Sequence, residues 1–512
     1  MNKQTEEHTQ FNVIKELISE FATSQTVKDR LLSLEPTSDL EKVRQLQAET
    51  GEALEILKDN QSIPFMMSQR IDRIFEKVEE GYVLDPKELH DVEDFLRSIK
   101  QLKQFFEKRE TQSPILSSYC KKIVIFNELE ERLSVAIKNN QVSSEASSKL
   151  KKARQRAQNY QSAIRDKLYK FINSPSNKSK IQEFMVVEKN GSLTVPLKSS
   201  FKTSVAGRVV SESAKGSTVY VELDNTKSLT EKLQEAHAEE IMIVYEVLAD
   251  FSEQIASCLK QMKDNTEIVF KLEEITAKAT YSLEIEGEKI RINDQGVIKL
   301  VNARHPLLKN KAVPLSMELG GEHRGLVITG SNSGGKTVVL KTIGLLTLMT
   351  MVGIHVPAEK ETEISTFNHV LVDIGDYQDI DNALSTFSGH MSNMKQVLDI
   401  ADTRSLVLVD EIGSGTEPSE GAALAMAMLD YMIDKGAIVV ASTHYGEIKE
   451  FAIKEPHFVT AAMAFNIETL EPLYQLLMNE VGQSNGLWLA KKMLISDEIL
   501  ERAQYHMNQR SR

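Results

Sequence analysis

The chain has 512 residues, a length that predicts several domains of ordinary size. Its composition, with 41% hydrophobic and 26% charged residues, excludes collagen-like and wholly disordered chains. A net charge of −13 excludes a uniformly basic nucleic-acid coat, because phosphate binding requires clustered cations. Cys120 and Cys258 stand far apart without Cys or His partners at metal spacing, and the N-terminus lacks a signal-peptide pattern. These features predict a cytoplasmic protein that does not cross a membrane.

The first part of the chain is helical. Apolar residues recur at helical spacing over 10–138, and a long polar helix is predicted over 144–171. Short β-branched runs at 184–187, 193–197, 207–210 and 217–223 then predict strands, with turns at Asn190-Gly191 and Lys215-Gly216. A second long helix over 226–272 predicts an antiparallel coiled-coil arm with a small β tip.

The arm has a strongly basic segment. Residues 149–180 hold ten Lys and Arg residues and a single acid, Asp166. Lys151 with Arg154 and Lys152 with Arg156 lie at spacings of i, i+3 and i, i+4, so part of the charge forms a stripe that can follow a phosphate backbone. The predicted nucleic-acid contacts are these four residues and Lys149. The alternative interpretation is a solvated coiled-coil face. We expect the segment to bind a duplex, a junction or folded ribosomal RNA, because no aromatic run suits single-strand stacking.

The sequence pattern changes after residue 306. Apolar strands predicted at 326–329, 370–373, 406–409 and 438–442 alternate with helical segments, as in a mostly parallel α/β sheet. Residues 330–337 fit G-x-x-x-x-G-K-[ST] between a strand and a helix, the context of a P-loop. Backbone amides there can surround phosphates, Lys336 supplies a charge, and the Thr337 hydroxyl can ligate Mg²⁺.

Two carboxylates, Asp410 and Glu411, follow the four apolar residues 406–409. We expect Asp410 to hold Mg²⁺ and Glu411 to activate the attacking water, rather than merely to cap the next helix. His444 ends another apolar strand and is a candidate γ-phosphate sensor; the alternative is a structural histidine. Gln378 follows the strand 370–373 and is a weaker candidate for contacting the metal or the water.

Taken together, four segments resemble the MutS family of ATPases: TGSNSGGKT, LSTFSGHM, LVLVDEIGSGTEPSEGAAL and STHYGEIK. Further segments, NARHPLL, PLKSSFKTSVAGRVVSESAKGSTVYVEL and NEVGQSNGLWLAKKM, resemble its second bacterial subfamily, MutS-II. Ser331 departs from a proline in the family pattern.

The resemblance implies a homodimer with two composite sites for ATP and Mg²⁺. It assigns ATP contacts to the P-loop residues Gly330, Asn332, Ser333, Gly334, Gly335, Lys336 and Thr337. Thr337 and Asp410 would hold the metal, Glu411 and His444 would act in hydrolysis, and Ser385 and Thr386 would contact the ATP of the other subunit. An alternative makes Ser385 a helix N-cap, with the chain entering a helix at Met391.

The predicted fold is mixed α and α/β. It comprises a helical core (1–140), a projecting coiled-coil arm (141–275) with a clamp tip at about 182–225, a return to the core (276–300) and an ABC-type ATPase and dimerisation domain (301–512). We also expect neither the family's mismatch-reading domain nor the Smr nuclease module, and so no nuclease activity from this chain.

The predicted function is an ATPase that clamps duplex or branched DNA in recombination or repair. The alternative is a ribosome-associated ATPase that recognises and splits stalled ribosomes. A transporter nucleotide-binding subunit is disfavoured because STFSGHM stands where an LSGGQ-type signature is expected. A non-hydrolysing clamp is disfavoured by Glu411.

Overall fold

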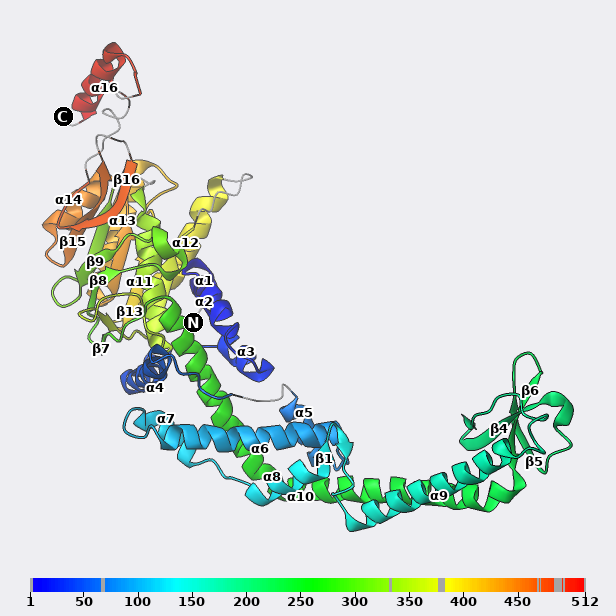
Figure 1. Cartoon of the computed structure of the whole chain (residues 1–512). Helices are drawn as coiled ribbons and strands as arrows, with labels where there is room; N and C mark the ends of the chain where they lie inside the picture. The colour runs from blue at the N-terminus through cyan, green and yellow to red at the C-terminus, as the bar shows by residue number, and fades with distance from the viewer. Residues whose placement is uncertain are drawn as a thin grey trace. The chain divides into compact units, whose positions relative to one another are not determined.

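The computed structural model assigns the chain to two compact units, which are described separately below (Figure 1). Its described residues are 3–65, 70–330, 334–375, 383–466, 469, 471–482, 490 and 493–510, with side chains omitted for 383–387 and 507–510. One unit comprises residues 1–64, 103–121 and 268–512, and the other comprises 65–102 and 122–267. Among the described residues, no helix combines the length and the apolarity needed to cross a bilayer.

The first unit is built on a six-stranded sheet of order β12-β13-β14-β10-β15-β16. Its first five strands are parallel and β16 is antiparallel to β15. The strands are β10 (Gly325–Thr329), β12 (His369–Asp373), β13 (Ser405–Val409), β14 (Ile438–Ser442), β15 (Phe458–Asn466) and β16 (Glu471–Met478). Every residue of β10, β13 and β14 is buried, which is why these strands read as continuous apolar runs.

Helices cover both faces of this sheet. On one face, α11 (Lys336–Met351) approaches so closely that a Cβ added to Gly344 would lie 2.7 Å from Leu408 Cδ1. On the other face, Val407 and Val409 belong to a core cluster with residues of three helices. These helices are α12 (Ala383–Ile400), α13 (Pro418–Asp434) and α14 (Gly446–Lys454).

A second sheet of four strands, in the order β7-β11-β8-β9, lies in the same unit. Its strands are β7 (Arg291–Asn293), β8 (Ile298–Ala303), β9 (Leu315–Leu319) and β11 (Glu363–Ser365). The sequence did not predict this sheet, because β11 joins it from about sixty residues beyond β8 and pairs in parallel with β7.

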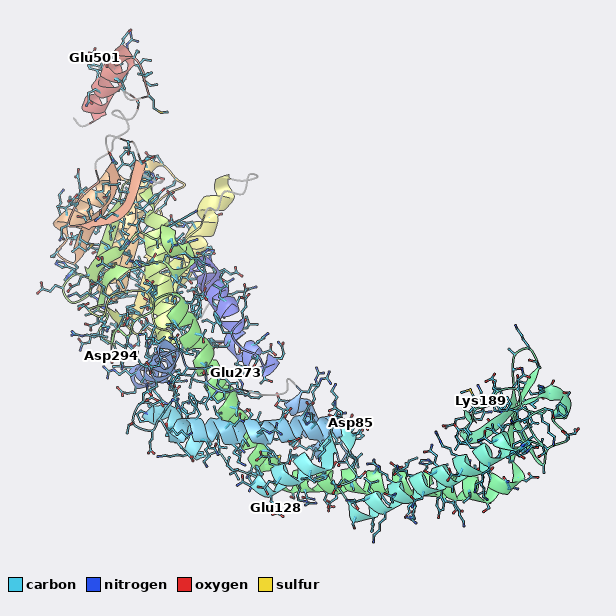
Figure 2. All side chains as sticks on the ribbon, viewed as in Figure 1. Asp85, Glu128, Lys189, Glu273, Asp294 and Glu501 are labelled. Carbon is cyan, nitrogen blue, oxygen red and sulfur yellow. The ribbon has the colours of Figure 1, made fainter. Side chains whose placement is uncertain are left out.

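Among the residues that the structure describes, six further helices belong to the first unit. The N-terminal part of this unit packs on the sheet through α1 (Lys3–His8), whose Thr5 Oγ1 donates to Val370 O of β12 (3.1 Å). The six helices are α1 (Lys3–His8), α2 (Phe11–Ser19), α3 (Gln25–Leu32), α4 (Leu40–Lys58), α7 (Pro114–Lys121) and α16 (Asp497–Arg510). The buried Glu273 of α10 (Lys227–Glu284), labelled in Figure 2, accepts from the hydroxyls of Thr23 and Ser24, both at 2.7 Å. Ser24 is also the N-cap of α3, so this carboxylate fixes the start of that helix.

The second unit contains the two long helices that the sequence predicts. Helix α9 (Ser148–Asn173) lies antiparallel to α10 (Lys227–Glu284), because Arg154 pairs with Glu240 while Lys167 donates to Asn225 O, just before α10 begins. Helix α10 extends twelve residues beyond the predicted end. The other elements are α5 (Ile71–Glu79), α6 (Pro86–Glu107), α8 (Asn127–Ala136), β1 (Ile137–Lys138) and β2 (Gln141–Val142). Helices α6 and α10 contribute residues to both units.

A four-stranded antiparallel sheet, β3-β4-β6-β5, joins α9 to α10 (Figure 1). Its strands are β3 (Val187–Lys189), β4 (Ser192–Lys198), β5 (Gly207–Glu212) and β6 (Thr218–Leu223). The turn predicted at Asn190-Gly191 is present, with positive φ at both residues (51° and 76°). The strand predicted over 184–187 is largely wrong, because β3 begins only at Val187 and Phe184 is 59% exposed.

Candidate functional site

The carboxyl ends of the parallel strands bring four sequence motifs to one edge of the six-stranded sheet. Asp410 follows β13, and its backbone N–H donates to Asp373 O at the end of β12 (2.8 Å). Thr443 follows β14, and its N–H donates to Ile328 O of β10 (3.1 Å). In open α/β sheets, ligands bind in the crevice at these strand ends. This edge is therefore the candidate nucleotide site.

The P-loop turns from β10 into α11 through glycines in unusual backbone conformations. Gly330 has φ 128° and Gly335, the N-cap of α11, has φ 95°. A Cβ on Gly335 would lie 2.9 Å from Tyr474 Cδ1, so conformation and space both require glycine there. Gly334 is buried, whereas Asn332 and Ser333 lie outside the described residues.

Lys336, the first residue of α11, is 2% exposed. Its Nζ donates to Gly330 O at 3.0 Å, so the ammonium folds back toward the start of the loop. Burial lowers the pKa of Lys336, while the carboxylates of Glu411 and Asp410 act in the opposite direction. The arrangement keeps a cation beside the glycine loop and the two acids.

Asp410 is bound by hydroxyl groups from two different elements. Thr337 Oγ1 donates to Asp410 Oδ2 (2.5 Å), and Ser442 Oγ of β14 donates to Asp410 Oδ1. The same Ser442 oxygen accepts from the backbone N–H of Glu411 (2.9 Å), whose φ is 49°. Hence Thr337 and Asp410, the two predicted metal ligands, are already in contact, and Ser442 couples the two acids.

Of the remaining predicted residues, the structure describes His444 and the backbones of Ser385 and Thr386. His444 is exposed at the end of β14, and its ring contacts that of Tyr445 (centroids 4.4 Å apart). Gln378 lies outside the described residues. Ser385 and Thr386 lie within α12, which begins at Ala383. The alternative that made Ser385 an N-cap before a helix at Met391 is therefore wrong, because the helix already includes Ser385.

Comparison with known proteins adds to this geometry. The family model of MutS domain V matches residues 326–510. The chain is 37% identical over 510 residues to a protein named endonuclease MutS2 from Halothermothrix orenii, covering 98% of this chain and 64% of that relative. It is 35% identical over 513 residues to endonuclease MutS2 from Alkaliphilus metalliredigens, covering 99% and 65% respectively. The chain belongs to the MutS family and is of the MutS2 type. It spans just under two thirds of the length of these curated relatives.

The same edge of the six-stranded sheet also contains an acid that the sequence analysis did not identify as a candidate, Asp373. Asp373 Oδ2, at the end of β12, lies 2.5 Å from His390 Nδ1 of α12, and both side chains are buried. Asn393 Nδ2, also on α12, donates to Asp373 Oδ1 (2.7 Å). His390 belongs to the segment LSTFSGHM, so the motif match was the available signal. The contacts fix the register between α12 and the sheet.

The five predicted nucleic-acid contacts lie on α9 in the second unit, and three of them are paired. Lys151 Nζ is 3.1 Å from Glu145 Oε1, Arg154 Nε is 2.7 Å from Glu240 Oε1, and Arg156 Nη2 is 2.6 Å from Glu239 Oε2. Lys149 and Lys152 are exposed. The acids come from the preceding loop and from α10, so the scarcity of acids within 149–180 did not indicate unpaired cations.

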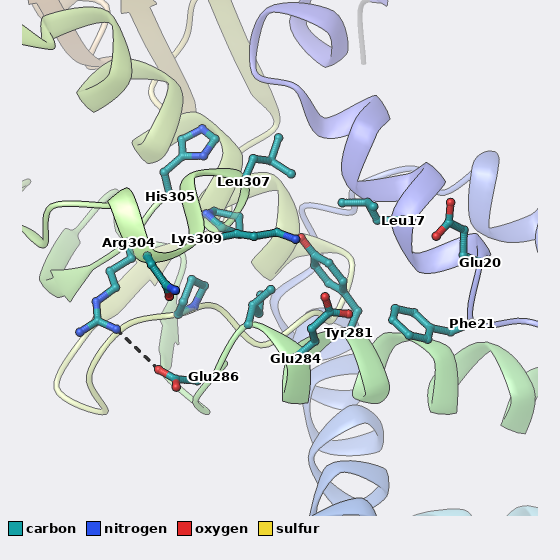
Figure 3. Close-up of a pocket in the computed structure, with 14 residues that line it drawn as sticks. Leu17, Glu20, Phe21, Tyr281, Glu284, Glu286, Arg304, His305, Leu307 and Lys309 are labelled. Atoms are coloured by element: carbon teal, nitrogen blue, oxygen red, sulfur yellow. Dashed lines mark ion pairs between the residues drawn. The ribbon is translucent and has the colours of Figure 1, made fainter.

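A separate cavity of about 490 Å³ lies in the first unit and involves none of the predicted site residues (Figure 3). It is lined by residues of α2, the end of α10, the segment 304–310 and Pro357. Arg304 forms an ion pair with Glu286 (3.6 Å) on its wall. Its mixed lining of three carboxylates and two cations selects no single class of ligand. Among the described residues, no group of three His, Cys, Asp or Glu side chains is arranged to hold a metal ion.

Proposed function

We propose that the edge of the six-stranded sheet binds ATP and Mg²⁺ and hydrolyses the nucleotide. The contact between Thr337 Oγ1 and Asp410 Oδ2 at 2.5 Å carries this proposal. The two oxygens come from a P-loop helix and from a strand end, and both suit Mg²⁺. Membership of the MutS family supports the assignment.

The chain's own residues divide the work in this proposal. Backbone amides of Gly330, Gly334 and Gly335, with Asn332 and Ser333, surround the phosphates, and Lys336 supplies their cation. Glu411 accepts a proton from the attacking water, and Ser442 holds its backbone in position. His444 senses the γ-phosphate and Gln378 contacts the metal or the water. Bound Mg²⁺ would neutralise charge on the β- and γ-phosphates.

We further propose that two copies form composite sites, in which Ser385 and Thr386 of one copy contact the ATP bound by the other. The position of both residues on α12, which His390 and Asn393 attach to the sheet edge, supports this assignment.

Glu411→Gln tests the hydrolytic role. Its carboxamide keeps the size of the side chain and removes the base, so ATP should still bind while turnover falls at least about a hundredfold. Glu417→Gln, in the loop before α13, is the control and should retain the wild-type rate. Unchanged turnover in Glu411→Gln, or an equal loss of ATP binding and turnover, would contradict the assignment.

For the whole chain we propose a helical core (1–140), a coiled-coil arm (141–275) with a clamp tip, a return segment (276–300) and an ATPase and dimerisation domain (301–512). ATP binding and hydrolysis in the dimer would clamp duplex or branched DNA. The basic surface of α9, including Lys149 and Lys152, supports a phosphate backbone as the partner. The same surface also suits ribosomal RNA, the alternative partner.

Affinity purification of the Glu411→Gln form from cells in the presence of ATP separates these partners. Enrichment of DNA over ribosomal subunits supports the DNA clamp, and the reverse supports the ribosome-associated ATPase. Lys336→Ala, which should not bind ATP, is the control for ATP-dependent capture.

The relatives are named endonucleases, a name that applies to those proteins. We propose that residues 1–512 do not cut nucleic acid themselves. Mg²⁺-dependent cleavage of DNA or RNA by purified chain that persists in Lys336→Ala would contradict this.

A further inference from the structure

Asp373, the last residue of β12, contacts two different parts of the sheet edge. Its backbone carbonyl accepts from the N–H of Asp410, the residue proposed to hold Mg²⁺ (2.8 Å). Its carboxylate contacts α12 instead: Oδ2 lies 2.5 Å from His390 Nδ1, and Oδ1 accepts from Asn393 Nδ2 at 2.7 Å. One residue therefore adjoins both the metal site of its own chain and the helix proposed to reach the second copy.

The two halves of α12 are attached to the sheet by different kinds of contact. Met394 and Val397, in the second half, are 1% and 3% exposed and belong to the apolar core on this face of the sheet. Among the described side chains of the helix, His390 is the first that is buried. The first turns of α12 extend away from the sheet (Figure 1). Asp373 therefore holds the helix at the point where it leaves the sheet.

Burial makes this attachment specific. The side chains of Asp373 and His390 are 0% and 7% exposed. A buried carboxylate is costly without partners, and α12 supplies two of them. An arrangement in which the first turns of α12 lift from β12 would leave the carboxylate without these two contacts and is disfavoured. Charge-assisted contacts of this kind also have few alternative geometries, so they define where the helix lies.

The position of His390 along α12 gives this contact a role in the composite site. Ser385 and Thr386 precede His390 by five and four residues, which is about 6–7 Å along the axis of an α-helix. A change of tilt at His390 would move both positions, while the second half of the helix stays packed in the core. A displacement of about 1 Å in a group that positions a substrate can slow a reaction about a hundredfold.

Resting on the proposed composite site, we propose that Asp373 is a positioning residue for the ATP bound by the other copy. Its carboxylate fixes the first turns of α12, and through them the contacts of Ser385 and Thr386 across the dimer. Its backbone carbonyl, which every substitution keeps, holds Asp410 of the same copy. The side chain of Asp373 thus acts on the second copy, although it adjoins the metal site of its own chain.

Asp373→Ala in the full chain tests this role, because it removes both contacts to α12 and keeps the carbonyl. Turnover should fall at least about tenfold, since the first turns of α12 are no longer fixed. ATP binding, measured by calorimetric titration, should be unchanged because Lys336 is intact, and retained binding also shows that the variant is folded. Asp399→Ala removes an exposed carboxylate of α12, paired with Lys395, and is the control that should keep the wild-type rate.

Mixing Asp373→Ala with Lys336→Ala distinguishes an effect on the second copy from an effect within one chain. In a mixed dimer, the Asp373→Ala copy binds ATP and is contacted by the intact α12 of the Lys336→Ala copy, so this site should hydrolyse. At equal amounts about half of the dimers are mixed and each has one complete site of two, so about a quarter of the wild-type rate should return. A side chain that served its own nucleotide, or only the stability of the fold, would give no recovery.

His390→Gln gives an independent test, because it alters the same contact from the side of α12. Its turnover should also fall, with recovery on mixing with Lys336→Ala. The double variant Asp373→Ala/His390→Gln should be no slower than Asp373→Ala, since the two side chains act as a unit. Additive losses in the double variant would overturn the inference.

The outcomes separate this inference from the proposed function. No recovery of hydrolysis when Ser385→Arg is mixed with Lys336→Ala overturns the composite site and this inference with it. Recovery in that mixture, but none with Asp373→Ala or His390→Gln, overturns the inference alone and assigns Asp373 to its own nucleotide site. Wild-type turnover in Asp373→Ala, or loss of ATP binding in both Asp373→Ala and His390→Gln, would overturn it as well.

Discussion

Asp410 at the edge of the six-stranded sheet and Arg154 on α9 are both held by charged or polar partners, but in different surroundings. Asp410 is bound by Thr337 and by Ser442, whose side chain is fully buried. Arg154 and its partner Glu240 keep 32% and 24% of their side-chain surface exposed. Buried contacts have few alternative geometries, whereas exposed ion pairs exchange readily with water and salt. Substitutions should therefore have large functional effects at the sheet edge and small ones on α9.

The largest expected effect is at Lys336. Lys336→Ala removes the buried cation beside the glycine loop, so the phosphates lose their direct charge partner and ATP binding should be lost. Lys341→Ala, on the same helix, is the control. Calorimetric titration with ATP and Mg²⁺ measures both. Tight binding of ATP by Lys336→Ala would contradict the assignment of this edge as the nucleotide site.

Next comes the composite site. Ser385→Arg places a long cation on α12 and should abolish hydrolysis while leaving nucleotide binding intact, because the bound ATP is no longer contacted by the second copy. Ser392→Arg, two turns further along α12, should keep its activity. Mixing Ser385→Arg with Lys336→Ala should restore at most one working site per dimer. A monomer that hydrolyses ATP at the wild-type rate would contradict the shared site.

Ser442→Ala removes the hydroxyl that joins Asp410 to the backbone of Glu411. Removing a hydrogen-bond partner of a metal ligand typically weakens metal binding ten- to a hundredfold. The Mg²⁺ concentration needed for half-maximal turnover should therefore rise by about tenfold in Ser442→Ala. Ser405→Ala removes another buried serine, at the opposite end of β13, and should leave the Mg²⁺ dependence unchanged. Equal effects of the two variants would mean that Ser442 acts only through stability.

The contrast between the two regions also explains what the sequence could predict. The P-loop, Asp410 and Glu411 each directly follow an apolar strand, so local spacing was enough to place them at one sheet edge. The strands there begin within one residue of their predicted starts. The ion pairs of α9 were missed because Glu239 and Glu240 come from a helix more than eighty residues later in the chain. The pairing of Asp373 with His390 likewise depends on how α12 packs against β12.

His305, a buried titratable group outside the candidate nucleotide site, should make the stability of the fold depend on pH. His305 is 5% exposed, and burial, with a smaller contribution from Lys341, lowers its pKa to about 4. The unfolded chain binds a proton near pH 6.5 and the folded chain does not, so this group reduces stability as the pH falls from about 6.5 toward 4. At pH 5 the loss should be roughly 2 kcal/mol.

His305→Gln should remove that part of the acid destabilisation. Unfolding by urea at pH 7 and pH 5 measures it, with the exposed His457→Gln as the control. The difference in unfolding free energy between the two pH values should shrink by roughly 2 kcal/mol in His305→Gln alone. An unchanged difference would show that His305 is protonated in the folded chain.

The smallest effect is expected for the ion pair between Arg154 and Glu240. The exposed surface of both side chains lets water replace either partner, so the coupling energy should be about 0.2–1 kcal/mol, within the range measured for exposed pairs. A double-mutant cycle with Arg154→Gln, Glu240→Gln and the double variant isolates this coupling from other effects of each substitution. Arg156→Gln with Glu239→Gln, on a more exposed pair, provides the matched cycle and should give an equal or smaller value.

A coupling above about 2 kcal/mol between Arg154 and Glu240 would place this pair with the buried contacts of the sheet edge and make the first half of α9 a fixed structural joint. A coupling near zero would instead leave Arg154 able to exchange Glu240 for a phosphate of the proposed nucleic-acid partner.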